Sequence, residues 1–253
     1  MKPTTPIWLL KKVTNRTLEK LVPLKRGNVD GLQYYWLRKG SPPQGRSPIQ
    51  RGVEFHDRIG LISGNIAIDV GANIGSYTLR LARNFRRVLA FEPNPQVSSI
   101  LRMNVAANKF HNVTVNQIAL SEAEGMLPIH IDPKHEGHGS LNPLHYGVSY
   151  DEVIPVVVRR MDDYYNPLER VDFVKIDVEG LELQVLKGGI ETISVWRPLL
   201  AVEIHCPAIR SATGRCACET CSYLSKTGYD VEVTGESQAV GPVHWVWASA
   251  VDP

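Results

Sequence analysis

The chain has 253 residues, of which 43% are hydrophobic and 21% are charged, enough for one large domain with a buried core, alone or with a small appendage. Its 20 glycines and 17 prolines are near average usage, which excludes collagen-like and low-complexity chains. The formal net charge of +2 gives no footprint for bulk nucleic-acid binding, and no apolar run reaches the roughly 18 residues of a transmembrane segment.

Residues 1–60 are expected to form an irregular N-terminal extension to the domain at residues 61–253. The apolar run at residues 7–10 is too short for the core of a secretion signal and is followed at once by lysines, so we expect a cytoplasmic protein. The segment is either a packed or frayed extension or a docking site for a partner or a membrane surface. Tyr34, Tyr35 and Trp36 within it either line a substrate site or belong to the core.

From residue 61 the pattern alternates between short β-rich runs and helical stretches. Strands are expected at residues 66–70, 88–92, 113–119, 155–158, 171–177, 199–204, 229–233 and 244–250. Helices are expected at residues 76–84, 95–108, 182–187 and 219–226, the third ending at a Gly-Gly stop. Strands that alternate with helices predict right-handed βαβ units, and therefore a doubly wound α/β fold with a mostly parallel sheet. The last two strands, joined by a loop, are expected to pair as an antiparallel hairpin at one edge.

A loop insertion at about residues 125–150 interrupts this alternation. It is polar and contains His130, His135, His138 and His145. We consider two interpretations: a lid that closes over the ligands, or a solvated surface loop with incidental histidines.

Residues 69–75, Asp-Val-Gly-Ala-Asn-Ile-Gly, which we call the glycine elbow, follow the first strand of the domain. Doubly wound sheets bind ligands at this position, beyond the carboxyl ends of their strands. Gly71 allows a sharp turn and a close approach of the backbone, and Gly75 lets the next helix start near the strand. Glu92 ends the second strand, where a carboxylate can accept both hydroxyls of a ribose.

These residues predict a cofactor of the nucleoside type. The dinucleotide fingerprint lacks its middle glycine, because Asn73 stands between Gly71 and Gly75, and no phosphate-binding Gly-Lys-Ser/Thr loop occurs. The carboxylate of Asp69 disfavours a pyrophosphate and suits a cationic ligand, such as a sulfonium with its α-amino group. The pattern therefore favours S-adenosylmethionine (SAM).

Several motifs in this order resemble the FkbM-type SAM-dependent methyltransferases. They are residues 69–75, Phe-Glu-Pro-Asn-Pro at 91–95, Ala-Leu-Ser at 119–121, Lys-Ile-Asp-Val-Glu-Gly-Leu-Glu at 175–182 with Leu-Lys-Gly-Gly at 186–189, and Glu-Ile-His at 203–205. The resemblance covers about residues 66–233. It implies a class I fold with a seven-stranded sheet and O-methylation of a small hydroxylated acceptor, such as a saccharide or a natural product. The N-terminal segment and the insertion lie outside the motifs, where substrate choice is expected.

The resemblance also implies cofactor-binding roles, group by group. The methionine end would contact Asp69, Gly71, Ala72, Asn73, Gly75 and Ser76; the ribose and adenine would contact Glu92, Asn94, Ala119, Leu120 and Ser121; Asp177 would lie next to the methyl donor.

A hydroxyl is a poor nucleophile, so we expect a general base or a metal ion to activate the acceptor. We expect His205 to be the general base, since the unperturbed pKa of histidine lies near working pH, with Asp177 or Glu179 orienting it. The rival account is a divalent cation held by Asp177, Glu203 and His205. Both residues also have an interpretation without a catalytic role. Glu179 would be a carboxylate stabilised by the dipole at a helix N-terminus, and His205 would be a hydrogen-bonded residue at the end of a strand.

All four cysteines lie within residues 206–221: Cys206, Cys216, Cys218 and Cys221. A reducing cytoplasm argues against structural disulfides. Four thiolates can make a tetrahedral zinc site, but the usual signature is two separated C-x2-C pairs, so buried free thiols are the other interpretation.

Three functions follow from these observations. The first is a SAM-dependent O-methyltransferase acting on a small-molecule acceptor, without a nucleic-acid partner. The second is a nucleotide-cofactor oxidoreductase, which the missing middle glycine disfavours. The third is a non-catalytic SAM-binding or scaffold module that binds its partner through the N-terminal segment. Assembly into a homo-oligomer is left open.

Overall fold

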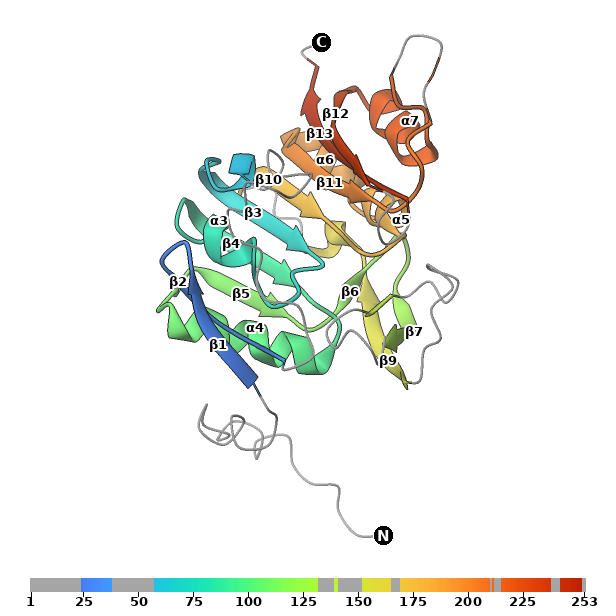
Figure 1. Cartoon of the computed structure of the whole chain (residues 1–253). Helices are drawn as coiled ribbons and strands as arrows, with labels where there is room; N and C mark the ends of the chain where they lie inside the picture. Colours follow the sequence, from blue (N-terminus) through green and yellow to red (C-terminus); the bar gives the residue numbers. More distant parts are fainter. Residues whose placement is uncertain are drawn as a thin grey trace.

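The computed structural model describes residues 24–37, 57–131, 139–140, 152–164, 169–209, 211, 215–237 and 242–251. These residues form a seven-stranded sheet, a four-stranded sheet and a two-stranded hairpin. Figure 1 shows the seven-stranded sheet at the centre of the molecule, with the hairpin and the four-stranded sheet at different places beside it.

The seven-stranded sheet has the order β12-β13-β11-β10-β3-β4-β5. Its strands are β3 (Gly64–Val70), β4 (Phe85–Phe91), β5 (Val113–Asn116), β10 (Val171–Ile176), β11 (Leu199–Ile204), β12 (Tyr229–Ser237) and β13 (Val243–Ala250). The five from β3 to β5 and β10 to β11 are parallel, whereas β13 runs antiparallel to both β11 and β12. The predicted doubly wound, mostly parallel sheet with an antiparallel hairpin at one edge is confirmed.

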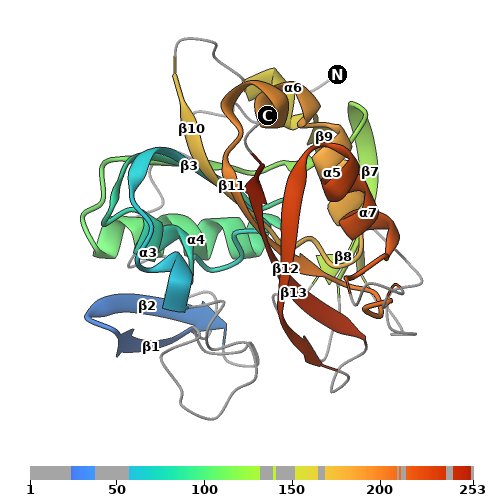
Figure 2. The same cartoon turned by 90° about the horizontal axis from the view of Figure 1, so that it is seen from above.

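Helices cover both faces of this sheet, as Figure 2 shows. They are α3 (Thr78–Leu81), α4 (Pro95–Ala107), α5 (Glu182–Lys187), α6 (Ile190–Trp196) and α7 (Glu219–Lys226). α5, α6 and α7 pack with Ile68, Val174 and Val202 on one face, while α3 and α4 cover the other. Each fully buried aliphatic side chain contributes about 1.5–3 kcal/mol relative to exposure, so these strands are stable only with both faces covered.

The sequence predicted a helix at residues 182–187 that stops at Gly188 and Gly189, and it predicted no helix directly after them. The two glycines break the helix, but the chain resumes as α6. A Cβ on Gly188 would lie 2.0 Å from the Ser121 carbonyl oxygen, and a Cβ on Gly189 would lie 2.8 Å from the Met161 sulfur. These glycines therefore allow close packing as well as a change of helix axis.

The expectation of an irregular N-terminal segment is wrong for residues 24–37. β1 (Leu24–Val29) and β2 (Leu32–Leu37) form an antiparallel hairpin. Asp30 and Gly31, with φ of 54° and 75°, make the left-handed two-residue turn that suits such a hairpin. Tyr34 is fully buried against α4, which supports the core interpretation of the aromatic cluster. The rest of residues 1–60, apart from residues 57–60, lies outside the described residues, and the boundary at residue 60 stays a prediction.

The expected strand at residues 113–119 is also divided. β5 ends at Asn116, and β6 (Ala119–Leu120) joins a second sheet of order β6-β9-β7-β8. Its other strands are β7 (Gly125–Ile131), β8 (Gly139–Ser140) and β9 (Glu152–Arg159). The first part of the predicted insertion is thus a strand paired with β9 along its length rather than a loop. His135, His138 and His145 lie outside the described residues.

Among the described helices, none combines the length and the apolar character that a membrane crossing requires.

Candidate active site

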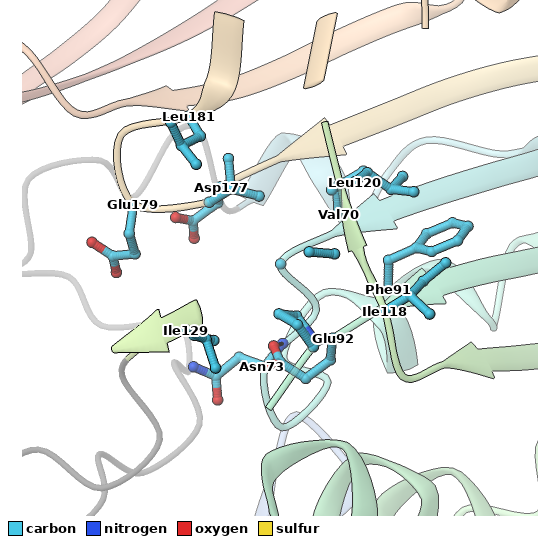
Figure 3. Close-up of a pocket in the computed structure, with 14 residues that line it drawn as sticks. Val70, Asn73, Phe91, Glu92, Ile118, Leu120, Ile129, Asp177, Glu179 and Leu181 are labelled. Atoms are coloured by element: carbon cyan, nitrogen blue, oxygen red, sulfur yellow. Dashed lines mark hydrogen bonds between the residues drawn. The ribbon is translucent and has the colours of Figure 1, made fainter. Parts of the chain in front are cut away.

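A cleft opens beyond the carboxyl ends of β3, β4 and β10, with about 690 Å³ of space including its open mouth. Val70, Phe91, Ile118 and Leu120 give it an apolar wall. Figure 3 shows Asn73 and Glu92 on one side of the hollow and Asp177 and Glu179 on the other. The cleft therefore presents carboxylates at both ends of an apolar surface.

The glycine elbow forms one rim of the cleft. Gly71 has a φ of 75°, and a Cβ there would lie 1.7 Å from the Asp177 carbonyl oxygen. Only glycine fits this contact, which lets the elbow lie directly against the end of β10. Gly75, with a φ of 97°, makes a similar approach to Leu101. The close approach inferred at Gly71 is thus made to the neighbouring strand.

Glu92 lies at one end of the cleft and is 7% exposed. Its Oε1 accepts a hydrogen bond from the Asn94 backbone N–H at 2.9 Å, and its Oε2 accepts one from the Asn73 N–H at 2.9 Å. Burial raises the pKa of Glu92 to about 7, although these two hydrogen bonds favour the ionised form. Each oxygen keeps a further lone pair, so the carboxylate can accept two more hydrogen bonds.

The residues predicted to bind the cofactor fall into two groups. Gly71, Asn73, Glu92, Ala119, Leu120 and Asp177 line the cleft, whereas Asp69, Ala72, Gly75, Ser76, Asn94 and Ser121 are not among its lining residues. Two members of the second group have supporting contacts. Asn94 caps α4 by accepting from the Gln96 and Val97 N–H groups, and Asp69 accepts a 2.5 Å hydrogen bond from Thr78 Oγ1.

Lys175 is a site residue to which the sequence analysis assigned no role. Although only 1% exposed, its ammonium donates to the Gly71 carbonyl oxygen and to Asp177 Oδ2, each at 3.2 Å, and lies 3.7 Å from Asp69 Oδ1. Burial lowers the pKa of Lys175, but Asp177, Asp69 and Glu203 more than offset this and raise it, so the ammonium stays charged. The sequence held one indication of this role, because Lys175 is a charged residue in an otherwise apolar stretch of a predicted strand.

His205 lies beside the cleft, with 5% of its side chain exposed. Its Nδ1 is 2.8 Å from Glu182 Oε1, and its Nε2 is 3.3 Å from Glu179 Oε2 and 3.9 Å from Asp177 Oδ1. Burial lowers the pKa of His205, but the hydrogen bond to Glu182 and the surrounding carboxylates raise it to about 10. The imidazolium form therefore prevails at neutral pH in the free chain. Glu182, 3% exposed, is the partner that the sequence analysis did not identify.

Asp177, Glu203 and His205 also meet the spatial requirement for a metal site. One ligand atom from each lies within 4.8 Å of the others. Burial and the charge of Asp177 raise the pKa of Glu203 to about 8, although His205 opposes this. Two carboxylates and an imidazole are donors that suit a hard divalent cation.

The fold defines the broad class of the protein. It resembles Trm5b from Pyrococcus abyssi, with a TM-score of 0.52 and 12% identity over 91% of this chain and 57% of that one. It also resembles TYW2 from P. horikoshii in complex with MeSAdo, with a TM-score of 0.53 and 14% identity over 89% of this chain and 69% of that one. The strand order and these likenesses define a class I methyltransferase fold.

The family follows from the sequence. The family described as "Methyltransferase FkbM domain" matches residues 69–229, and the chain belongs to this methyltransferase family. It is 33% identical to Methyltransferase sdnD of Sordaria araneosa over 183 residues, 56% of this chain and 71% of that protein. It is 30% identical to 2-O-methyltransferase NoeI of Sinorhizobium fredii over 148 residues, 52% of this chain and 60% of that protein. Membership confirms the resemblance and decides against the oxidoreductase alternative.

Proposed function

We propose that the protein transfers a methyl group from SAM to a hydroxyl of a small acceptor, a saccharide or a glycosylated natural product. The observation that carries this proposal is the cleft itself, with buried Glu92 at one end and Asp177 with Glu179 at the other. The 2-O-methyltransferase among the relatives supports a hydroxyl acceptor.

The residues of the cleft fit the donor. Glu92 has two lone pairs left for ribose hydroxyls, and Phe91, Ile118 and Leu120 offer an apolar surface to an adenine. Asp177 and Glu179 provide negative charge for the sulfonium and the α-amino group. SAM supplies the electrophilic methyl group when bound.

His205 serves as the general base in this proposal. In the free chain Glu182, with smaller contributions from Asp177 and Glu179, keeps His205 protonated, so the imidazolium must first release its Nε2 proton. A cation bound beside Asp177 and Glu179 would weaken their contributions and favour this release. Nε2 then accepts the proton of the acceptor hydroxyl as the oxygen–carbon bond forms and the sulfur–carbon bond breaks. Glu182 holds Nδ1 and stabilises the imidazolium that results.

The metal alternative uses the same residues differently. Asp177, Glu203 and His205 would hold a divalent cation that lowers the pKa of the acceptor hydroxyl, with Glu182 orienting the imidazole from behind. Removing and replacing the metal separates the two accounts, because transfer by a general base does not require Mg²⁺ or Mn²⁺.

The test combines methyl-labelled SAM with a panel of saccharides and hydroxylated metabolites, with and without EDTA, and detects products by mass spectrometry. We expect methylated product in both arms. Binding of SAM with no transfer to any acceptor would favour the non-catalytic alternative. Loss of transfer in EDTA that added Mg²⁺ or Mn²⁺ restores would favour a metal held by Asp177, Glu203 and His205.

The residue-level prediction concerns His205→Ala. We expect turnover to fall by about 10²-fold or more, because a positioned base contributes about 10²–10⁴-fold, with little change in SAM affinity by calorimetry. His111→Ala is the matched control, since His111 is exposed in the loop before β5. Unchanged turnover in His205→Ala would remove His205 from the mechanism.

A further inference from the structure

A second cluster of ligating side chains involves residues 216–221, which comprise the segment before α7 and the first turn of that helix, and the strand β13. It consists of Cys216, Cys218, Cys221 and His244, whose ligand atoms all lie within 4.8 Å of one another. Cys218, Cys221 and His244 are at most 1% exposed, and Cys216 is 9% exposed. Free thiols gathered in the core around one imidazole nitrogen call for an explanation beyond packing.

The distances within the cluster match coordination of a single ion. His244 Nε2 lies 3.5 Å from Cys216 Sγ, 3.6 Å from Cys218 Sγ and 3.6 Å from Cys221 Sγ. Bonds of about 2.3 Å from zinc to sulfur and about 2.0 Å to nitrogen, set at the tetrahedral angle, place each sulfur about 3.5 Å from the nitrogen. We propose that these four residues bind one structural Zn²⁺ ion.

The hydrogen bonds around the cluster prepare its donors. His244 Nδ1 lies 2.8 Å from the Cys206 carbonyl oxygen, which can only accept, so Nδ1 carries the proton and Nε2 presents its lone pair to the sulfurs. Such support of a ligating histidine by a backbone carbonyl is a regular feature of zinc sites. Cys218 Sγ accepts a hydrogen bond from the Cys221 N–H at 3.4 Å, which orients this sulfur at the N-terminus of α7.

The donor set selects both the metal and its role. Three sulfurs and one imidazole suit zinc, and four protein ligands leave no open position for a substrate, so the ion is structural. It joins the segment at residues 216–221 to β13, the strand between β11 and β12. His244 also holds the Cys206 carbonyl, one residue after His205, so the ion supports the backbone beside the candidate active site.

This assignment differs from both interpretations of the sequence, the four-cysteine zinc site and the buried free thiols. The fourth ligand is His244, which lies on a strand distant in sequence, and not Cys206, which falls outside the set of four. The spacing C-x-C-x2-C, with a histidine 23 residues later, departs from the usual two C-x2-C pairs, so the sequence did not reveal this set of ligands. The fold reveals it, because β13 places His244 beside the three cysteines.

The test measures zinc in the full chain, purified without chelators, by elemental mass spectrometry. We expect one zinc per chain in the wild type and in the control Cys206→Ser, and at least a tenfold lower content in Cys221→Ser and in His244→Gln. Zinc content below a tenth of an ion per wild-type chain would overturn the proposal. Loss of zinc in Cys206→Ser with retention in His244→Gln would overturn the ligand set.

A second measurement does not depend on the variants folding. Wild-type protein stripped of metal is titrated with Co²⁺, and we expect sulfur-to-metal charge-transfer and tetrahedral d–d absorption that saturates at one ion and disappears on adding Zn²⁺. Absence of these bands would contradict the site. A count of reactive thiols in the denatured, chelated chain gives a further check, because two reactive thiols instead of four would indicate a disulfide and would also contradict the site. Neither readout involves methyl transfer, so this inference stands or fails separately from the proposed function.

Discussion

Glu92 is the carboxylate of the cleft whose charge changes nearest to neutral pH. Burial raises its pKa from 4.5 to about 7, against the opposing effect of two backbone hydrogen bonds. Because the folded-state pKa is the higher one, the contribution of Glu92 to folding stability is fully present below the unfolded pKa and is lost as pH rises through about 7. Binding and stability therefore respond to this residue with opposite signs.

The affinity for S-adenosylhomocysteine, the demethylated product of the donor, should rise with pH. Ribose hydroxyls donate to the ionised form of Glu92, so each pH unit below about 7 should weaken binding by up to about tenfold. Calorimetric titrations between about pH 5.5 and about pH 8 measure this slope. Glu92→Gln should bind weakly with a flat profile, whereas Glu122→Gln, whose side chain is 49% exposed, should match the wild type. An undiminished slope in Glu92→Gln would assign the pH dependence to another group.

The sequence predicted the place of those site residues that follow directly after the carboxyl end of a strand. Gly71 and Glu92 follow parallel strands, and the topology alone brings such positions to one edge of the sheet. Lys175 and Glu182 could not be assigned in this way. Their roles depend on distances to Asp69 and His205, which lie far away in sequence and approach only after the sheet has formed.

At the scale of elements, the hairpin β1–β2 is joined to α4 through Asn104, which is fully buried. Its Oδ1 accepts from the Tyr35 N–H at 2.6 Å, and its Nδ2 donates to the Tyr35 carbonyl oxygen at 3.0 Å and to the Ile74 carbonyl oxygen at 2.7 Å. One side chain thus connects the hairpin, the helix and the glycine elbow.

Asn104→Ala should destabilise the protein by about 2–4 kcal/mol, because it leaves buried backbone groups of Tyr35 and Ile74 without a partner. The midpoint and slope of urea unfolding, followed by circular dichroism, give this free energy. Arg102→Ala is the control on the same helix, since Arg102 is exposed and should change stability by less than about 0.5 kcal/mol. Equal stability of the two variants would show that the hairpin contributes little to the fold.

Elements with a strong local pattern were predicted to the residue. The bounds of α5, α7 and β11 agree with the expectation, because a helix stop or a continuous apolar run marks each of them. The division between β5 and β6 was missed because the sequence analysis predicted one strand over residues 113–119. Pairing of β6 with β9, about 40 residues later, decides where the chain leaves the first sheet. The hairpin was missed because its aromatic residues were considered without the turn at Asp30 and Gly31.

At the scale of the whole molecule, the cleft lies between two sheets. The ends of β3, β4 and β10 provide one wall, and Ala119, Leu120 and Ile129 from the four-stranded sheet provide the other. A ligand in the cleft contacts both sheets, so opening of either wall requires its release. The hairpin β1–β2 contributes no residue to the described cleft lining.

Saturation with S-adenosylhomocysteine should therefore slow amide hydrogen exchange unevenly over the chain. A ligand at a hundred times its dissociation constant adds about 2.7 kcal/mol to any opening that destroys its site, which slows exchange through that opening by up to about a hundredfold. We expect this in β7 and the glycine elbow, with little change in the exchange of β1 and β2 through local opening. Exchange measured by mass spectrometry with and without the ligand tests this, and Glu92→Gln at the same ligand concentration should lose the effect. Slowing confined to the seven-stranded sheet would show that β7 forms no part of the binding site.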